Sequence, residues 1–278
     1  MQTRILEKQD ILTGYDAVCP LYPHLPSVSH WRAWEYAGYQ HYHLSGDILD
    51  LGCGDGQYFR LLWPQTGCVV GVDINPAAIS LAEGSGVYKT VHLTEAHQVP
   101  EPDGRFDHVF ANCSLEHMDE LDAVLAEVYR CLKPGGTLLC SVVTHRFIEW
   151  AWLGQLMAQA GFREAAQALN QDFLDFHNLA NPLTPTEWEQ RFLKAKLVPE
   201  DHIPLLPQHN SSVFLFIDSL WHLRQAGGGE VGHQVLPILA TNPNFPAGFR
   251  SVLAGLLDME TDWLDCSGAI FHARKPMA

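Results

Sequence analysis

The chain has 278 residues, 47% of them hydrophobic and 18% charged, which is enough to bury one large or two modest cores without disulfides or structural metals. Its 17 Lys and Arg residues stand against 32 Asp and Glu residues, and the resulting formal net charge of −15 argues against nucleic acid as a partner. The residues after Met1 are polar and no window has the apolar length of a membrane span, so we expect a cytoplasmic protein.

The seven cysteines are widely spaced and contain no C-x-x-C pair. This pattern favours reduced thiols over a disulfide framework and predicts no metal site.

The first 45 residues are rich in aromatic residues and prolines, and a helix is expected over residues 29–42. Disordered tails are poor in aromatic residues, so this segment is predicted to be ordered. We interpret residues 1–45 as a helical, aromatic lid segment.

Residues 47–144 alternate short apolar runs with amphipathic ones. Strands that alternate with helices predict a parallel sheet covered by helices on both faces. The strand runs lack polar alternation because both of their faces are buried. A helical period from Leu121 to Leu132 ends at Lys133-Pro134-Gly135-Gly136, where proline and glycine stop the helix.

Two helical insertions, residues 146–183 and 207–264, are expected to interrupt this α/β core and to form a substrate cap. A capping box at Thr184-Pro185-Thr186-Glu187 predicts a helix between them, followed by a strand near residues 198–206. Residues 46–145, 184–206 and 265–278 then make up the core, with a final strand in residues 266–276.

The stretch DILDLGCGDGQYFRLL places Gly52, Gly54 and Gly56 directly after a buried strand. Glycines in the first strand-to-helix turn allow a tight bend and let the backbone approach a ligand. The spacing G-x-G-x-G differs from the dinucleotide pattern G-x-G-x-x-G, and Asp55 at the helix entrance would repel a pyrophosphate. The turn therefore favours a cofactor without phosphates at this point.

Asp50–Gly56 resembles motif I of the class I S-adenosylmethionine-dependent methyltransferases, specifically the ubiquinone/menaquinone-biosynthesis-like subgroup. Four further segments agree with that subgroup in order and spacing: residues 71–74, 95–107, 106–117 and 132–136. The resemblance implies a doubly wound, mostly parallel seven-stranded sheet of the Rossmann-like methyltransferase type, with S-adenosylmethionine as cofactor and S-adenosylhomocysteine as product.

The resemblance also implies the residues that hold the cofactor. Asp73 ends the second strand and would accept the ribose hydroxyls. Glu95 and Ala96 would meet the adenine, although Glu95 stands where the family usually has Asp and His97 where it usually has Glu. The implied cofactor-binding residues are Asp50, Gly52, Cys53, Gly54, Gly56, Asp73, Ile74, Glu95, Ala96 and Asn112.

Each of these residues also has a structural interpretation. Asp50 either orients the glycine turn or contacts the ligand, and Cys53 contributes its backbone with the thiol as a small packing group. Asp73 is also compatible with a helix-terminus residue, and the whole domain with a nucleotide-binding domain of another kind.

Histidines at the carboxyl ends of strands are candidates for a general base in methyl transfer. His117 follows the fourth predicted core strand, His145 follows the fifth, and His177 in the first insertion comes third. The alternative for each is a hydrogen-bonded or solvated histidine. The substrate or lid candidates are Tyr15, Tyr22, Trp31, His177 and Trp221, for which packing in the core is the alternative.

These patterns predict an enzyme that transfers a methyl group by in-line displacement to oxygen, nitrogen or carbon of a small acceptor. An apolar or aromatic natural product, a quinone-like ring, a lipid or a sugar derivative fits best. A methyltransferase for a carrier-bound or peptide substrate, or a protein that binds the cofactor without methyl transfer, remains an alternative. The sequence leaves the oligomeric state open, a homodimer included.

Overall fold

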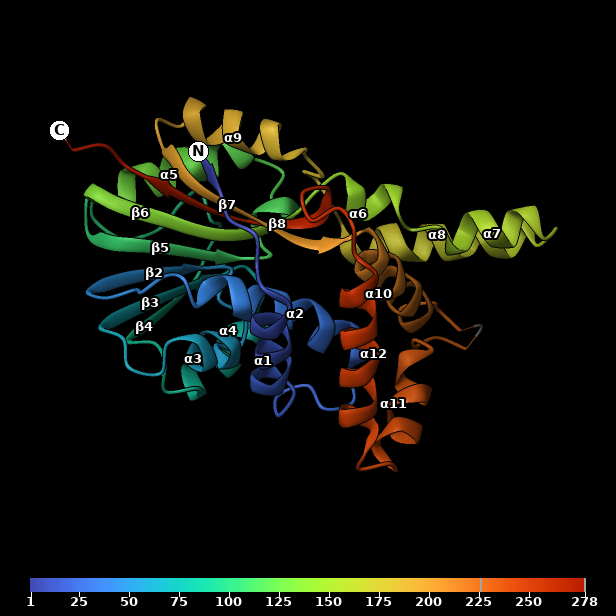
Figure 1. Cartoon of the computed structure of the whole chain (residues 1–278). Coiled ribbons are helices and arrows are strands. Elements are labelled where there is room, and N and C mark those ends of the chain that lie inside the picture. The colour runs from blue at the N-terminus through green and yellow to red at the C-terminus, as the bar shows by residue number, and fades with distance from the viewer. Residues whose placement is uncertain (226, 278) are drawn as a thin grey trace.

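A computed structural model describes residues 1–225 and 227–277. In this part of the chain, one sheet of eight strands has the order β1-β7-β8-β6-β5-β2-β3-β4 (Figure 1). All neighbouring strands are parallel except β8, which runs antiparallel to β6 and β7. The strands are β1 Gln2–Thr3, β2 Asp47–Leu51, β3 Cys68–Asp73, β4 Thr90–Leu93, β5 Phe106–Asn112, β6 Leu132–Val143, β7 Val198–Pro207 and β8 Cys266–Arg274.

The doubly wound, mostly parallel α/β fold predicted from the sequence is confirmed, with one strand more than the seven expected. The additional strand β1 pairs Gln2 with Asp201 and Thr3 with His202 at the edge of the sheet. Two residues are too short to show an alternating pattern, so the sequence carried no signal for this strand.

Helices cover both faces of the sheet. α5 Leu121–Cys131 and α9 Pro185–Lys194 lie on one face, and α1 Lys8–Val18, α2 Pro26–Tyr39 and α3 Gln57–Leu62 lie on the other (Figure 1). Along β2, Ile48 packs with the second group and Leu49 with the first, as the strand pleat requires. α4 Pro76–Gly84 connects β3 to β4.

The predicted capping box begins α9. The Thr184 hydroxyl accepts from the Glu187 N–H at 3.2 Å, and the Glu187 carboxylate accepts from the Thr184 N–H at 2.8 Å. These two bonds satisfy backbone donors that a helix start leaves free.

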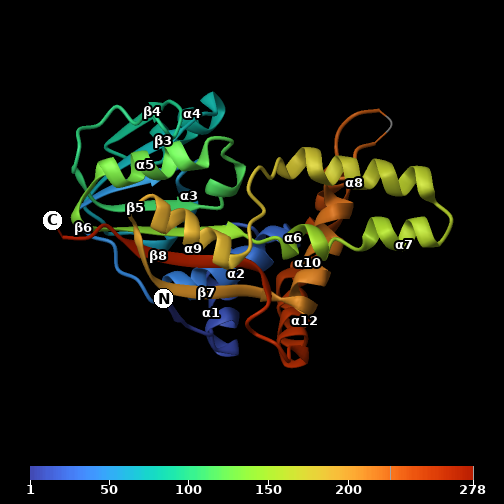
Figure 2. The same ribbon diagram turned by 90° about the horizontal axis from the view of Figure 1, so that it is seen from above.

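Further helices follow the carboxyl ends of β6 and β7. α6 Arg146–Glu149, α7 Leu153–Gln159 and α8 Arg163–His177 come after β6, and α10 Gln208–Trp221, α11 Gly232–Ala240 and α12 Phe245–Met259 come after β7. Both views show α7 and α8 as a hairpin that projects away from the sheet, whereas α10 packs against α2 and α12 (Figures 1 and 2). None of the helices in residues 1–225 and 227–277 is long and apolar enough to cross a membrane.

The chain order reverses between β2 and β5. From β2 the chain proceeds through β3 to β4 on one side, whereas β5 and β6 lie on the other. Such a switch point leaves a crevice outside the carboxyl ends of the central strands, where ligands bind in open α/β sheets.

Candidate functional site

The turn after β2 needs glycine at three positions. Gly52, Gly54 and Gly56 have φ angles of 80°, 55° and 76°, in the left-handed region that other residues enter only at a cost. A Cβ on Gly52 would lie 2.6 Å from Ser114, and one on Gly56 would lie 2.6 Å from the Tyr88 ring. A Cβ on Gly54 would meet nothing within 4 Å. Close approach of protein side chains therefore explains Gly52 and Gly56, and only Gly54 leaves open space beside the backbone.

Asp73 joins this turn to the end of β3. Its Oδ2 accepts from the Gly54 N–H at 2.9 Å, and its Oδ1 accepts from the Asn75 N–H at 2.8 Å. Each carboxylate oxygen has further lone-pair capacity, so these bonds orient Asp73 and still allow it to accept hydroxyl donors.

A cavity of about 660 Å³ opens at the switch point, within the range of small-molecule sites. Its walls include four carboxylates, and none of the described residues that line it is a Lys or Arg, so the cavity favours a cationic ligand. Ile74 at its rim is 62% exposed, an apolar surface that a flat ring can cover. The carboxylates are Asp73, Glu95, Asp119 and Glu120, and the apolar lining residues are Val72, Ile74, Ala96, Met118 and Val124.

Asp50 and Cys53 do not line this cavity. The Tyr88 hydroxyl donates to Asp50 at 2.7 Å and lies 3.2 Å from the Cys53 carbonyl. Burial raises the pKa of Asp50 to about 7, with a further increase from the nearby charge of Asp73. These contacts favour the loop-orienting role for Asp50, and Tyr88, which the sequence did not single out, holds the turn in place.

Asn112 also points away from the cavity, because its Oδ1 accepts from the Tyr39 hydroxyl at 2.9 Å. The next two residues, Cys113 and Ser114, line the cavity instead. The Ser114 hydroxyl donates to the Leu51 carbonyl at 2.8 Å and so bridges the ends of β5 and β2. Their position directly after β5 is the sequence signal that would have identified them.

A buried polar cluster lies behind Cys113. Glu35 of α2 is completely buried, and one of its oxygens accepts from the Cys113 thiol at 2.9 Å and from the Ser141 hydroxyl at 2.6 Å. Its other oxygen forms an ion pair with Arg32. The Trp31 N–H donates to the Cys113 sulfur at 3.2 Å. Burial and the charge of Glu35 hold the pKa of Cys113 well above its usual range, so the thiol is protonated.

Of the three candidate histidines, His117 lines the cavity. Its Nδ1 lies 3.4 Å from the Asn178 carbonyl. Since a carbonyl only accepts, Nδ1 carries the proton and Nε2 has a free lone pair. Desolvation lowers the pKa of His117, although the Asn178 carbonyl opposes this, so the ring is neutral at pH 7.

The other two histidines lie elsewhere. His145 does not line the cavity and sits near Glu187, whose pKa is lowered mainly by its bonds to Thr184 and to a smaller extent by His145. His177 is also outside the lining, with its Nε2 2.8 Å from Asp218 on α10. In residues 1–225 and 227–277, no three His, Cys, Asp or Glu side chains are grouped to hold a metal ion.

The lid candidates are outside the cavity lining as well. Tyr15 is buried and donates to the Pro246 carbonyl at 3.0 Å, and Trp221 packs against Gly232 at the start of α11. Tyr22 is half-buried; burial raises its pKa, and nearby Arg32 opposes the increase. Packing between helices accounts for Tyr15 and Trp221.

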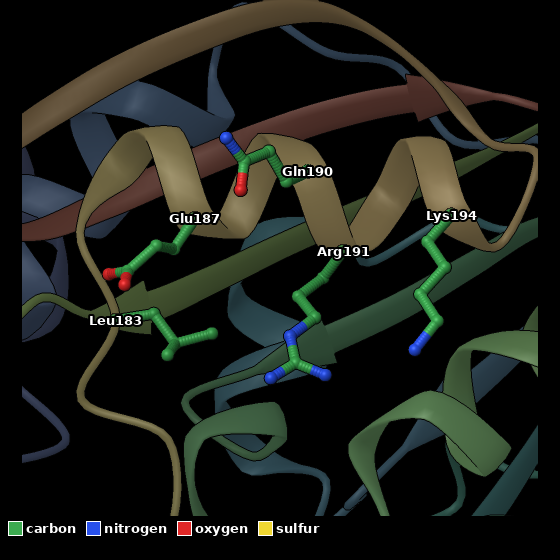
Figure 3. Close-up of a pocket in the computed structure, with 5 residues that line it drawn as sticks. All are labelled: Leu183, Glu187, Gln190, Arg191 and Lys194. Atoms are coloured by element: carbon green, nitrogen blue, oxygen red, sulfur yellow. The ribbon is translucent and has the colours of Figure 1, made fainter.

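A second hollow of about 400 Å³ runs along the surface of α9 (Figure 3). Its charged groups already have partners. Arg191 and Lys194 bind Asp122 at 2.8 and 2.6 Å, and Glu187 caps the helix. This groove therefore offers no unpaired charge to a ligand.

Residues 49–140 match a family model described as a methyltransferase domain. Residues 49–140 form a class I S-adenosylmethionine-dependent methyltransferase domain. This span contains the glycine turn, Asp73 and all the lining carboxylates described above. The predicted likeness to the ubiquinone/menaquinone-biosynthesis-like subgroup is confirmed.

The relatives of this methyltransferase domain act on different acceptors. The chain is 30% identical over 155 residues to the demethylmenaquinone methyltransferase of Symbiobacterium thermophilum. The aligned residues cover 52% of this chain and 60% of that protein. It is 34% identical over 102 residues to the malonyl-[acyl-carrier protein] O-methyltransferase of Serratia marcescens. The aligned residues cover 36% of this chain and 40% of that protein. The chain thus spans about half the length of these relatives.

A solved structure supports the fold over a longer span. The methyltransferase of Haloferax volcanii in complex with its activator Trm112 superposes with a TM-score of 0.57 at 14% identity, covering 94% of this chain and 97% of that chain. At this level of identity the likeness establishes the fold alone.

Proposed function

We propose that the chain binds S-adenosylmethionine in the 660 Å³ cavity and transfers its methyl group to a small-molecule acceptor. The observation that carries the proposal is the bond between Gly54 and Asp73, which joins the bare turn to a carboxylate facing the cavity. When bound, the cofactor supplies a methyl group on a cationic sulfonium. The acidic lining suits that positive charge.

The chain's own residues divide the binding between two ends of the cavity. Asp73 accepts the ribose hydroxyls, while Glu95, Ala96 and the exposed Ile74 bind the adenine. At the other end, Gly52 and the backbone after β5 hold the methionine part. Cys113 and Ser114 take the place first assigned to Asn112, since they line the cavity and Asn112 is bonded to Tyr39.

His117 is the acceptor-activating base in this proposal. Its neutral ring has a free Nε2, which can accept the proton of a hydroxyl or an acidic carbon during methylation. The apolar lining residues Met118 and Val124 support an apolar or aromatic acceptor.

A carrier-bound acyl acceptor is the second candidate, and the similarity to a malonyl-[acyl-carrier protein] O-methyltransferase favours it. A carboxylate acceptor needs no base, because it is already ionised. Removal of the His117 imidazole therefore separates the two candidates. His117→Ala should slow methylation of a phenol or quinol and leave methylation of a carboxylate unchanged.

Calorimetry with S-adenosylmethionine and S-adenosylhomocysteine tests the binding step. Asp73→Ala should weaken binding about 10- to 100-fold, since hydrogen bonds to a charged group contribute about 1.5–3 kcal/mol each. The matched control is Asp175→Ala, an exposed carboxylate on α8 far from the glycine turn. Absence of heat with the wild-type protein would overturn the proposal. Labelled cofactor with quinol, phenol and malonyl-carrier probes then identifies the acceptor class.

A further inference from the structure

Asn181 fastens the segment between α8 and α9 to the wall of the cavity. This segment, Asn178–Leu183, is called the latch loop below. The Asn181 N–H donates to the Glu116 carbonyl at 2.9 Å, and its side-chain amide donates to the Met118 carbonyl at 2.7 Å and the Leu115 carbonyl at 3.3 Å. All three carbonyls belong to the short turn after β5, which supplies His117 and Met118 to the cavity.

The latch loop also contributes to the cavity directly. Asn178 lines it, has a left-handed φ of 41° that ends α8, and offers its carbonyl to His117. Asparagine is one of the few residues other than glycine that adopt this conformation readily. A ligand in the cavity therefore touches both the turn and the loop that Asn181 joins.

Residues 146–183 have further contacts with the rest of the molecule. Phe173 of α8 packs on Phe147 in the hydrophobic core, and the Asp172 carboxylate accepts from the Arg224 N–H at 2.9 Å. The two ends of this segment are tied by the bond from the His145 N–H to the Leu183 carbonyl at 3.2 Å. Beyond that point α7 and α8 project as a hairpin (Figure 2). His177, the residue before Asn178, binds Asp218 on α10, so the loop also connects the hairpin to the helices that follow β7.

We propose that Asn181 is a positioning residue that couples occupancy of the cavity to the order of the α7–α8 hairpin. A ligand that contacts Asn178 and His117 rigidifies the latch loop, and the loop holds the end of α8 in place. Linkage requires the converse, so an ordered hairpin raises the affinity for the ligand by the same factor. The inference rests on the proposed function only for the identity of the ligand.

Hydrogen exchange of the full chain tests the coupling, with S-adenosylhomocysteine as the probe. In the wild-type protein, saturating probe should slow exchange of the α7–α8 amides, by about 5- to 20-fold for a coupling of typical size. In Asn181→Ala this slowing should vanish, and the dissociation constant should rise by the same factor. Gln167→Ala on the exposed side of α8 is the matched control and should behave as wild type.

Asn181→Ser provides a second variant that keeps the backbone bond to Glu116 and a hydroxyl donor, on a side chain too short to span the Leu115 and Met118 carbonyls. It should lose the coupling while the ligand-free protein keeps its melting temperature within a few degrees. Probe-induced protection that persists in Asn181→Ser would overturn the inference. Heat of binding without protection in the wild type would overturn the coupling alone, whereas absence of heat would overturn the proposed function as well.

Discussion

The two sides of the cavity are held in shape by different kinds of interaction. On the side of β2 and β3, backbone geometry and one carboxylate shape the wall, through Gly52, Gly54 and Asp73. On the opposite side, the wall after β5 is held by side chains from distant segments, notably Glu35 and Asn181. The first side depends on dihedral angles within a short stretch, and the second depends on buried polar partners remaining paired. Substitutions on the first side should therefore act through backbone strain, and substitutions on the second through the loss of buried polar contacts.

Glu35→Ala should have the largest effect, because it leaves Arg32, Ser141 and the Cys113 thiol without their common acceptor. Removal of one partner of a buried ion pair costs about 3–5 kcal/mol, and the partial exposure of Arg32 places the expected loss near the lower end. Urea unfolding measures this change. Glu164→Ala, an exposed carboxylate in the first turn of α8, should alter stability by less than about 0.5 kcal/mol. Equal effects of the two substitutions would contradict the role given to Glu35.

A change of pH should alter the stability linked to a buried base and to a buried acid in opposite directions. Burial lowers the pKa of His30 to about 4 from 6.5, against the hydrogen bond to Asn210 that raises it. The stability linked to neutral His30 is present above pH 6.5 and is lost as the pH falls towards 4, by up to about 3 kcal/mol. Burial raises the pKa of Glu116 from 4.5 to about 8, so its contribution is present below pH 4.5 and is lost as the pH rises towards 8.

Urea unfolding of His30→Gln and Glu116→Gln across this pH range tests both assignments. The first variant should show a weaker loss of stability as the pH falls from 6.5 to 4, and the second a weaker loss as it rises from 4.5 to 8. If the unfolding free energies of wild type and variant depend on pH in the same way, the corresponding residue does not cause the pH dependence.

Gly52→Ala and Gly54→Ala compare two glycines in one turn, and the difference between them is the smallest effect expected. Both introduce a side chain at positive φ, which costs about 1–2 kcal/mol. Only the alanine at position 52 also meets Ser114, at 2.6 Å, which adds about 1–3 kcal/mol of overpacking. The expected difference in unfolding free energy is thus about 1–3 kcal/mol, with Gly52→Ala the less stable. The reverse order would show that Ser114 moves freely.

The sequence identified the segments of the backbone-built side, and the structure brings Gly54 and Asp73 together there. The glycines and Asp73 of this side lie within one strand-helix-strand unit, where spacing alone determines which groups meet. The side chains of the opposite wall come from α2 and the latch loop, which are distant from β5 along the chain. No local pattern shows that Glu35 reaches Cys113 or that Asn181 reaches Met118. Among the histidines, position after a strand did not distinguish His117 from His145, because the side-chain direction decides which one faces the cavity.

The placement of β8 between β6 and β7 has a consequence for biogenesis. β1 and β7 pair with each other, and they join the rest of the sheet only through β8, Cys266–Arg274, which lies between β7 and β6. Until β8 is in place, one edge of β6 therefore stays unpaired, and an unpaired strand edge promotes misassociation. Completion of the sheet waits for a strand that follows both of its neighbours in the chain.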